Sequence, residues 1–314
     1  MQYDIAIAGL FVGFVIGLTG MGGGALMTPV LVLVFGVSPS AAISSDVVAS
    51  LVLKPIGGGV HARRGTVNWR LVRWLSVGSV PGAFLGAYII DRVAHEGLED
   101  TIRLVLGAVL LVAAGAILAK MFVQAHRGTA PSDDMMDPAL VRPAITVAIG
   151  AIGGLIVGMT SVGSGSLMIV MLMLLYPMLS SRETIGTDLV QAVPLVGAAA
   201  LGHLLFGNVQ FGLTASVLLG AIPGVYAGAH VSSRVGDRYI RPVLVAVLAI
   251  SSLKLLGVPN GPLLGATVVT VGGLGAVYAR LAARGRQRSR SSTTTDDITS
   301  PTSVASATSM PSTT

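Results

Sequence analysis

The sequence predicts an all-α polytopic membrane protein with two pseudo-symmetric, inverted repeats that contain interrupted or re-entrant helices. Of its 314 residues, 53% are hydrophobic and 11% are charged, and the mean hydropathy is +0.81, far above that of a soluble domain. The charges lie in short segments between long apolar runs, as expected when loops alternate with spans of about 20 residues. A glycine-rich block also occurs twice, as GFVIGLTGMGGGALM at residues 13–27 and as GLIVGMTSVGSGSLM at residues 154–168.

The duplicated block predicts a helix that is broken midway. Glycine costs roughly 1 kcal/mol per position relative to alanine inside a helix, so a glycine-dense apolar stretch is a poor continuous helix. In lipid, a break is tolerated only where the freed backbone groups are buried in protein or face a watery cavity. Two broken helices at corresponding places are typical of a transporter with its substrate site between them.

The first half begins with a broken segment over residues 5–35, with the break at Thr19–Gly24. Its second arm, Ala25–Phe35, rises only about 17 Å as a helix, so we expect a re-entrant or strongly tilted arm rather than a full crossing. Further spans are predicted at residues 41–60, 71–90 and 104–121, and a polar linker at 124–142 follows.

The second half repeats this order, because residues such as Asp46, His61 and Gly82 recur 142 positions later. We expect a broken pair at 141–176 and spans at 184–206, 211–231, 243–256 and 262–281. The predicted organisation is a first repeat at 1–123, the linker at 124–142, a second repeat at 143–282 and a disordered Ser/Thr-rich tail at 283–314.

The loop charges predict the orientation. The basic loops 61–70 and 232–241 and the basic start of the tail should face the cytoplasm. This holds only if loop 207–210 faces the side opposite to its twin at 65–68, which makes the repeats inverted. The expected location is the cell membrane, with a cytoplasmic C-terminal tail.

The breaks are the predicted substrate-binding site. An interrupted helix places an N-terminus, with unpaired N–H groups and about half a positive charge, inside the membrane, which suits an anion. The alternative is that the glycines only let helices approach closely. The candidate substrate-binding residues at the breaks are Thr19, Gly22, Gly23, Gly24, Thr160, Ser161, Ser164 and Ser166.

Lys54 is a further substrate-binding candidate, because a basic group within a span is costly and normally faces the bundle interior or a water-filled path. Val196 replaces it in the second half, which suggests a single cation that complements an anionic substrate. The alternatives are a pair with Asp46 or Asp188, and snorkelling toward the nearby loop.

Four residues are candidates for ion coupling. Asp46 and Asp188 occupy twin positions and could relay a proton or bind Na⁺, although a carboxylate near a helix N-terminus is also favourable with no transport role. His61 and His203 end their predicted helices, where capping the last carbonyl groups is the alternative to proton coupling.

Other classes of protein are excluded by the residues. There is no cysteine, no G-x-S-x-G, no Walker loop and no cluster with metal-ligand spacing, so we expect no enzyme, no cofactor and no metal. Gly20–Ala25 matches G-x-G-x-x-A, but it lies in an apolar segment rather than after a strand. The net charge of +6 belongs mostly to loops and tail, so nucleic acid is not an expected partner.

Several blocks resemble the TauE/SafE sulfite exporter family, also called the toluene-sulfonate uptake permease group. They are GLTGMGGG, SSD, HARRGTVNW, IGTDL and HLLFGNV, and the resemblance covers roughly residues 5 to 256. It implies transport of a small sulfur-containing or organic anion such as sulfite or a sulfonate, in either direction. By position the family blocks fall on Gly20–Gly24, Ser44–Asp46, His61, Gly65, Thr187, Asp188, His203 and Gly207.

The sequence therefore predicts a secondary transporter that moves a small anion across the bilayer by alternating access. Coupling to H⁺ or Na⁺ and a homodimer are both left open. The nearest alternative function is an anion-selective channel.

Overall fold

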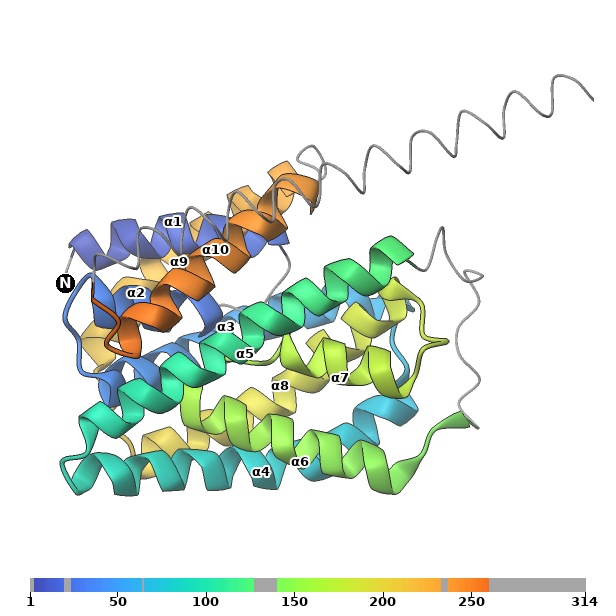
Figure 1. Ribbon diagram of the computed structural model, residues 1–314, viewed down its shortest axis with the longest axis horizontal. Helices are drawn as coiled ribbons and strands as arrows, with labels where there is room; N and C mark the ends of the chain where they lie inside the picture. The colour runs from blue at the N-terminus through green and yellow to red at the C-terminus, as the bar shows by residue number, and fades with distance from the viewer. Residues whose placement is uncertain (1–2, 20–23, 64, 127–139, 233–236, 260–314) are drawn as a thin grey trace, which may run out of the picture. The chain divides into compact units, whose positions relative to one another are not determined.

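The computed structural model describes residues 3–19, 24–63, 65–126, 140–232 and 237–259, all of which belong to the compact unit Met1–Val271. Every regular element longer than one turn in these ranges is an α-helix, which confirms the predicted fold class (Figure 1). The predicted span at 262–281 and the tail lie outside the described residues. The helices are α1 (Tyr3–Thr19), α2 (Gly24–Leu33), α3 (Pro39–Arg63), α4 (Trp69–His95), α5 (Glu99–His126), α6 (Pro143–Thr160), α7 (Leu167–Leu175), α8 (Ser181–Leu205), α9 (Phe211–Ser232) and α10 (Asp237–Leu255).

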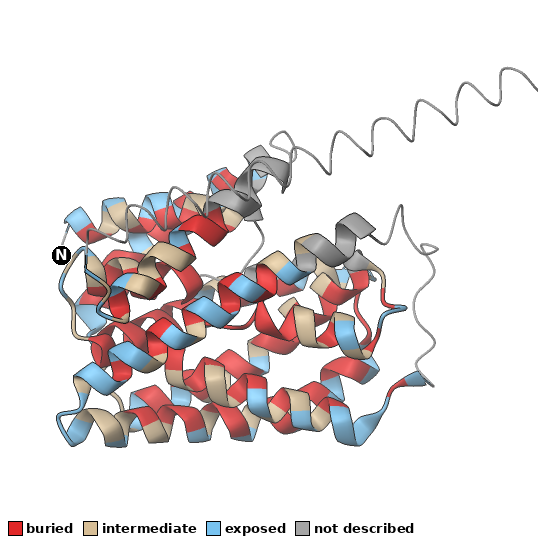
Figure 2. Ribbon diagram, viewed as in Figure 1, coloured by how far each residue is buried: buried red, intermediate tan, exposed pale blue. Residues whose placement is uncertain are grey.

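Four of the described helices are long and apolar enough to cross a membrane, within α5, α6, α8 and α9. Their outward sides carry large apolar side chains such as Leu111, Ile152 and Tyr226, which are exposed as lipid contact requires. Figure 2 shows buried residues gathered where the helices face one another. The chain is therefore a polytopic membrane protein, as predicted.

The predicted break in the second half is present. In the first half, the described part of α1 ends at Thr19 and that of α2 begins at Gly24, so the predicted break falls mostly on residues 20–23, outside the described ranges. In the second half, residues 161–166 separate α6 from α7. The backbone of Ser161 has a φ of 60°, in the left-handed region, and this ends α6 because an α-helix cannot continue through it.

The segment α6–α7 is re-entrant. Tyr176 directly follows α7, and its Oη accepts a hydrogen bond from the backbone N–H of Arg142, the residue before α6, at 2.9 Å. The end of α7 thus returns to the start of α6. Since α7 has only nine residues, it rises about 13 Å, less than half of a bilayer core.

The segment α1–α2 begins and ends at the opposite face. Helix α1 runs parallel to α9, whose preceding residue Gln210 donates its backbone N–H to Ser45 Oγ near the start of α3. Helix α2 leads through residues 34–38 into the same start of α3. The two re-entrant segments therefore enter from opposite faces, which we call the Ser40 face, where α3 begins, and the Asn68 face, where α4 begins.

Helices α3 and α8 occupy corresponding places in the two halves and run antiparallel. Near the start of α3, Ser44 contacts His203 of α8, whereas beyond the end of α3, Thr66 packs against Gly186 of α8. Loops 65–68 and 207–210 consequently lie at opposite ends of α3, as the predicted orientation requires.

Equivalent contacts also recur with the halves exchanged. The backbone N–H of Asn68 donates to Thr187 Oγ1 at 3.0 Å, and the backbone N–H of Gln210 donates to Ser45 Oγ at 3.3 Å. Gln210 lies 142 positions after Asn68, and Ser45 lies 142 positions before Thr187. These reciprocal contacts support the inverted repeat, which stays a prediction. The predicted domain boundaries also stay predictions.

Two glycine seams hold the outer helices together. A Cβ at Gly82 of α4 would overlap the carbonyl oxygen of Ala151 in α6, so the two backbones are in direct contact. The same holds for Gly224 of α9 against Leu10 of α1. Small residues allow this approach in membrane bundles. On the α4 and α9 sides the seams consist of Gly78, Gly82 and Gly86 against Val147, Ala151 and Leu155, and of Gly220, Gly224 and Gly228 against Ala6, Leu10 and Phe14.

We expect Gly82→Ala to lower the free energy of unfolding by about 1–3 kcal/mol, because the added methyl group would force two backbones apart. The control is Gly115→Ala in α5, where no atom lies within 4 Å of the added Cβ. Thermal unfolding of the detergent-purified variants measures both. Equal unfolding midpoints for Gly82→Ala and the wild type would contradict the close seam.

Candidate transport site

The start of α2 lies in contact with the break after α6. Gly24, the first residue of α2, packs against Ser161 at the break after α6, and a Cβ on Gly24 would overlap the Ser161 carbonyl oxygen. The predicted meeting of the two interrupted segments is thus present for these two residues. Gly22 and Gly23 lie outside the described residues, as does the side chain of Thr19.

Asp46 of α3 joins both re-entrant segments. Its Oδ2 accepts hydrogen bonds from Thr28 Oγ1 of α2 at 2.7 Å and from Ser161 Oγ at 2.8 Å. All three side chains are buried. A buried carboxylate without such donors would be strongly unfavourable, so these bonds account for its presence inside the bundle.

The interpretation of Asp46 and Asp188 as helix N-terminal carboxylates is wrong. Helix α3 begins at Pro39 and α8 at Ser181, so each aspartate is the eighth residue of its helix. The favourable effect of the dipole falls off within the first turn. Asp188 is buried on α8, within the bundle rather than at its end.

Lys54 points inward from α3, two turns beyond Asp46. Its side chain is 93% buried, and Nζ donates a hydrogen bond to Ser164 Oγ in the break between α6 and α7. The snorkelling alternative is therefore wrong, and Lys54 is a cation placed at the break itself.

The break in the second half is held together by its own groups. Thr160 Oγ1 donates to the Ile156 carbonyl at 2.7 Å and accepts from the N–H of Val162 at 3.2 Å. The carbonyl oxygen of Gly163 accepts the N–H groups of residues 166, 167 and 168. The first amides of α7, expected to face an anion, are thus bonded within the chain in this arrangement.

Two buried polar atoms near α7 and α8 lack a hydrogen-bond partner within the described ranges. They are Oγ of Ser166, directly before α7, and Oε1 of Gln191, whose Nε2 donates to Ser79 Oγ of α4 at 2.6 Å. Polar atoms buried in this way are expected to bind water or a ligand. Ser166 was predicted as a site residue, whereas the roles of Thr28, Ser79 and Gln191 were not.

The twin histidines make different contacts. Nδ1 of His61 lies 3.0 Å from Oγ1 of Thr66, which donates to the His61 carbonyl at 3.3 Å, so His61 bonds beyond the end of its own helix. His203 instead reaches Ser44 of α3 and the Gly158 carbonyl of α6, so the interpretation of its ring as a cap of its own helix is wrong.

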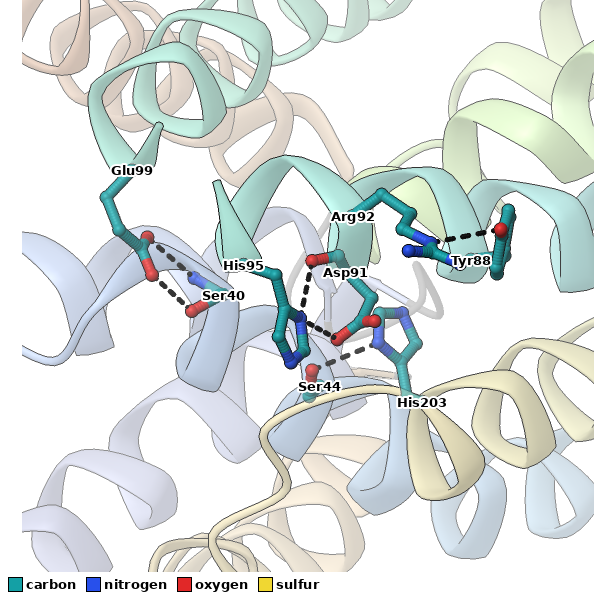
Figure 3. Close-up of polar contacts among 8 residues, drawn as sticks. All are labelled: Ser40, Ser44, Tyr88, Asp91, Arg92, His95, Glu99 and His203. Atoms are coloured by element: carbon teal, nitrogen blue, oxygen red, sulfur yellow. Dashed lines mark hydrogen bonds and ion pairs between the residues drawn. The ribbon is translucent and has the colours of Figure 1, made fainter. Parts of the chain in front are cut away.

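A cavity of about 380 Å³ opens at the Ser40 face, and His203 is one of its lining residues. The sequence does not predict this cavity, because its wall is built from the ends of α3, α4, α5 and α8. Figure 3 shows His203 together with five other polar residues of the cavity wall, which are Ser40, Ser44, Asp91, His95 and Glu99. Within the described residues no group of three or more histidine or acidic side chains could hold a metal ion.

An all-helical bundle with buried charges where interrupted helices meet defines a membrane transporter. The profile of the family described as Sulfite exporter TauE/SafE matches residues 5–255, and the chain belongs to this family.

The chain is similar to several curated proteins. It is 39% identical over 258 residues to Probable membrane transporter protein YjnA of Bacillus subtilis (strain 168), covering 82% of this chain and 100% of that protein. It is 28% identical over 228 residues to a Probable membrane transporter protein of Xylella fastidiosa (strain 9a5c), covering 72% and 83%. No solved structure matches the chain.

We expect Thr28→Val to lower the free energy of unfolding by about 1.5–3 kcal/mol, because it removes a donor to the buried Asp46 carboxylate and keeps the side-chain volume. Thr28→Ser retains the hydroxyl and should lose less. The matched control is Thr101→Val, at an exposed position of α5. Unfolding midpoints that are the same for Thr28→Val and Thr101→Val would argue against the Asp46 junction.

Proposed function

We propose that the protein is a secondary transporter of a small anion, most simply sulfite, a sulfonate or a related organosulfur or organic acid. The observation that carries this proposal is Lys54, a buried cation whose Nζ bonds Ser164 at the helix break. The family name supports the substrate class, since sulfite and sulfonates are compact oxyanions.

An anion would bind by replacing the Ser164 hydroxyl on Lys54. A charge-assisted bond between ammonium and an oxyanion is roughly twice as strong as a bond between neutral groups, so the exchange is favourable. The hydroxyls of Ser164 and Ser166 would then donate to the anion. Thr19, Gly22, Gly23 and Gly24 complete the proposed site from the first half.

The charges at the site favour coupling to a cation. The bundle interior holds two buried aspartates, Asp46 and Asp188, as well as Lys54. Uptake of H⁺ by either carboxyl group, or binding of Na⁺ to it, would reduce the negative charge that an incoming anion meets. Asp46, Asp188, His61 and His203 are the proposed coupling residues.

Alternating access would follow from the predicted inverted repeat. The re-entrant segments enter from opposite faces and meet at the site, so an exchange of conformation between the halves would open the site first to one face and then to the other. We place the protein in the cell membrane with loop 61–70 and the C-terminal tail in the cytoplasm.

The test is uptake of labelled sulfite, methanesulfonate and a carboxylate into proteoliposomes. We expect Lys54→Met to reduce uptake of the preferred anion about 10- to 100-fold, because it removes a charged hydrogen-bond donor worth about 1.5–3 kcal/mol. Lys254→Met, at an exposed position of α10, is the control and should transport as the wild type does.

Normal uptake by Lys54→Met would refute the anion site at Lys54. Uptake of none of the three anions by the wild type would refute the proposed substrate class. Flux that does not saturate, together with unitary conductance in planar bilayers, would identify a channel instead.

A further inference from the structure

His203 connects a water-accessible cavity to a re-entrant helix. Its ring is fully buried in the last turn of α8, with Nε2 at 2.8 Å from the carbonyl oxygen of Gly158 and Nδ1 at 3.0 Å from Oγ of Ser44. A carbonyl oxygen can only accept, so Nε2 carries a hydrogen and donates it. In the neutral ring, Nδ1 therefore accepts from the Ser44 hydroxyl.

Ser44 and His203 both line the cavity at the Ser40 face (Figure 3). Its volume of about 380 Å³ leaves room for a chain of water molecules, each of which takes about 30 Å³ in the liquid. The Nδ1 nitrogen thus lies one hydroxyl group away from water at this face.

The acidic groups of the cavity are already bonded. Asp91 pairs with His95 of the same helix at 3.2 Å, and Glu99 of α5 accepts from the N–H and the hydroxyl of Ser40. Arg92 points to Tyr88 instead, with its Nε at 3.0 Å from the phenol oxygen (Figure 3). Helix α7, which also packs against α8, has only apolar side chains.

His203 differs from these side chains because it also bonds a re-entrant segment, through the hydrogen bond from Nε2 to the Gly158 carbonyl oxygen of α6. Gly158 lies in the last turn of that helix, three residues before Ser161, whose hydroxyl bonds Asp46. A change at the ring acts on the end of α6 and hence on the break.

We propose that His203 binds the coupling proton of transport, which it receives from the cavity through the Ser44 hydroxyl. This inference rests on the proposed transport function and names the coupling ion and its site. In the transfer, the Ser44 O–H bond breaks as its proton moves to Nδ1, and a hydronium ion in the cavity returns a proton to Ser44 Oγ. The ring gains one proton and the hydroxyl is restored.

Proton binding reverses one hydrogen bond and strengthens another. Nδ1–H now donates to Ser44 Oγ, so the Ser44 hydroxyl must turn to another acceptor. The bond from Nε2–H to the Gly158 carbonyl becomes charge-assisted, and the imidazolium lies at the negative end of the α6 dipole. The bound proton thus holds the end of α6, and its release loosens the break.

The first arm of the test measures anion uptake into proteoliposomes with and without a pH gradient that is acidic on the side of the labelled anion. We expect the gradient to stimulate wild-type uptake several-fold. In His203→Gln, which keeps an N–H donor but cannot take up a proton, the ratio of the two rates should fall to one. The control is His230→Gln, an exposed histidine of α9, which should keep the wild-type ratio.

A wild-type ratio in His203→Gln would overturn the proton site. So would a ratio of one in the wild type, provided that an anion is transported.

The second arm needs no transport. The chain has no cysteine, so Met159→Cys places a single thiol in the last turn of α6. Its rate of labelling by a water-soluble methanethiosulfonate is followed against pH, with His203 and with His203→Gln in the same background. The thiolate fraction of the introduced cysteine rises with pH in both proteins, and this rise alone changes the labelling rate. The effect of His203 is therefore read from the difference between the two pH profiles.

We expect the labelling profile to change shape when His203 is replaced. Parallel profiles would overturn the proton site even if transport is found. Absence of transport together with different profiles would refute the proposed function and leave the proton site standing.

Discussion

The buried carboxylate of Asp46 has to be satisfied by donors from two other parts of the chain, and this requirement organises the site. Thr28 supplies one hydroxyl from α2 and Ser161 supplies the other from the break after α6. In a low-dielectric interior such a group is stable only when its donors stay in place. The carboxylate therefore fixes both re-entrant segments against α3, and Lys54 on the same helix is brought to the break.

The glycine seams make this arrangement possible. They bring α4 against α6 and α1 against α9 with backbones in contact, so each re-entrant segment is attached to a long helix of the other half. The inner pair α3 and α8 is then left to carry the buried polar residues. Close packing outside and hydrogen bonding inside thus divide the bundle into a scaffold and a polar interior.

Much of this architecture could be predicted from the sequence because it follows from composition and repetition. The all-helical fold, the break after α6, its re-entrant arm and the inward position of Lys54 depend on local glycine content and on the cost of charge in lipid. The sequence also makes Asp46 a candidate residue, but it does not predict the partners of its carboxylate. Ser161 lies 115 residues away, and no local pattern relates the two.

The remaining features depend on tertiary contacts in the same way. The Gly163 carbonyl oxygen accepts hydrogen bonds from the first N–H groups of α7 because of the local backbone conformation. Glycine permits many backbone conformations, so the sequence does not predict this one. His61 and His203 are equivalent in sequence, yet only the packing of α8 against α3 and α6 turns the second ring away from its own helix end. The cavity beside it requires four helix ends to meet.

The unequal surroundings of the two aspartates have an energetic consequence. In the second half, the position 141 residues after Thr28 is Ile169, and the position 141 residues before Ser161 is Gly20, neither of which offers a hydroxyl. In the proposed transport cycle, an exchange of conformation between the halves would break the two hydrogen bonds of Asp46, each worth about 1.5–3 kcal/mol, and neither twin position would supply a hydroxyl to Asp188. The two orientations of the proposed carrier would then differ in free energy.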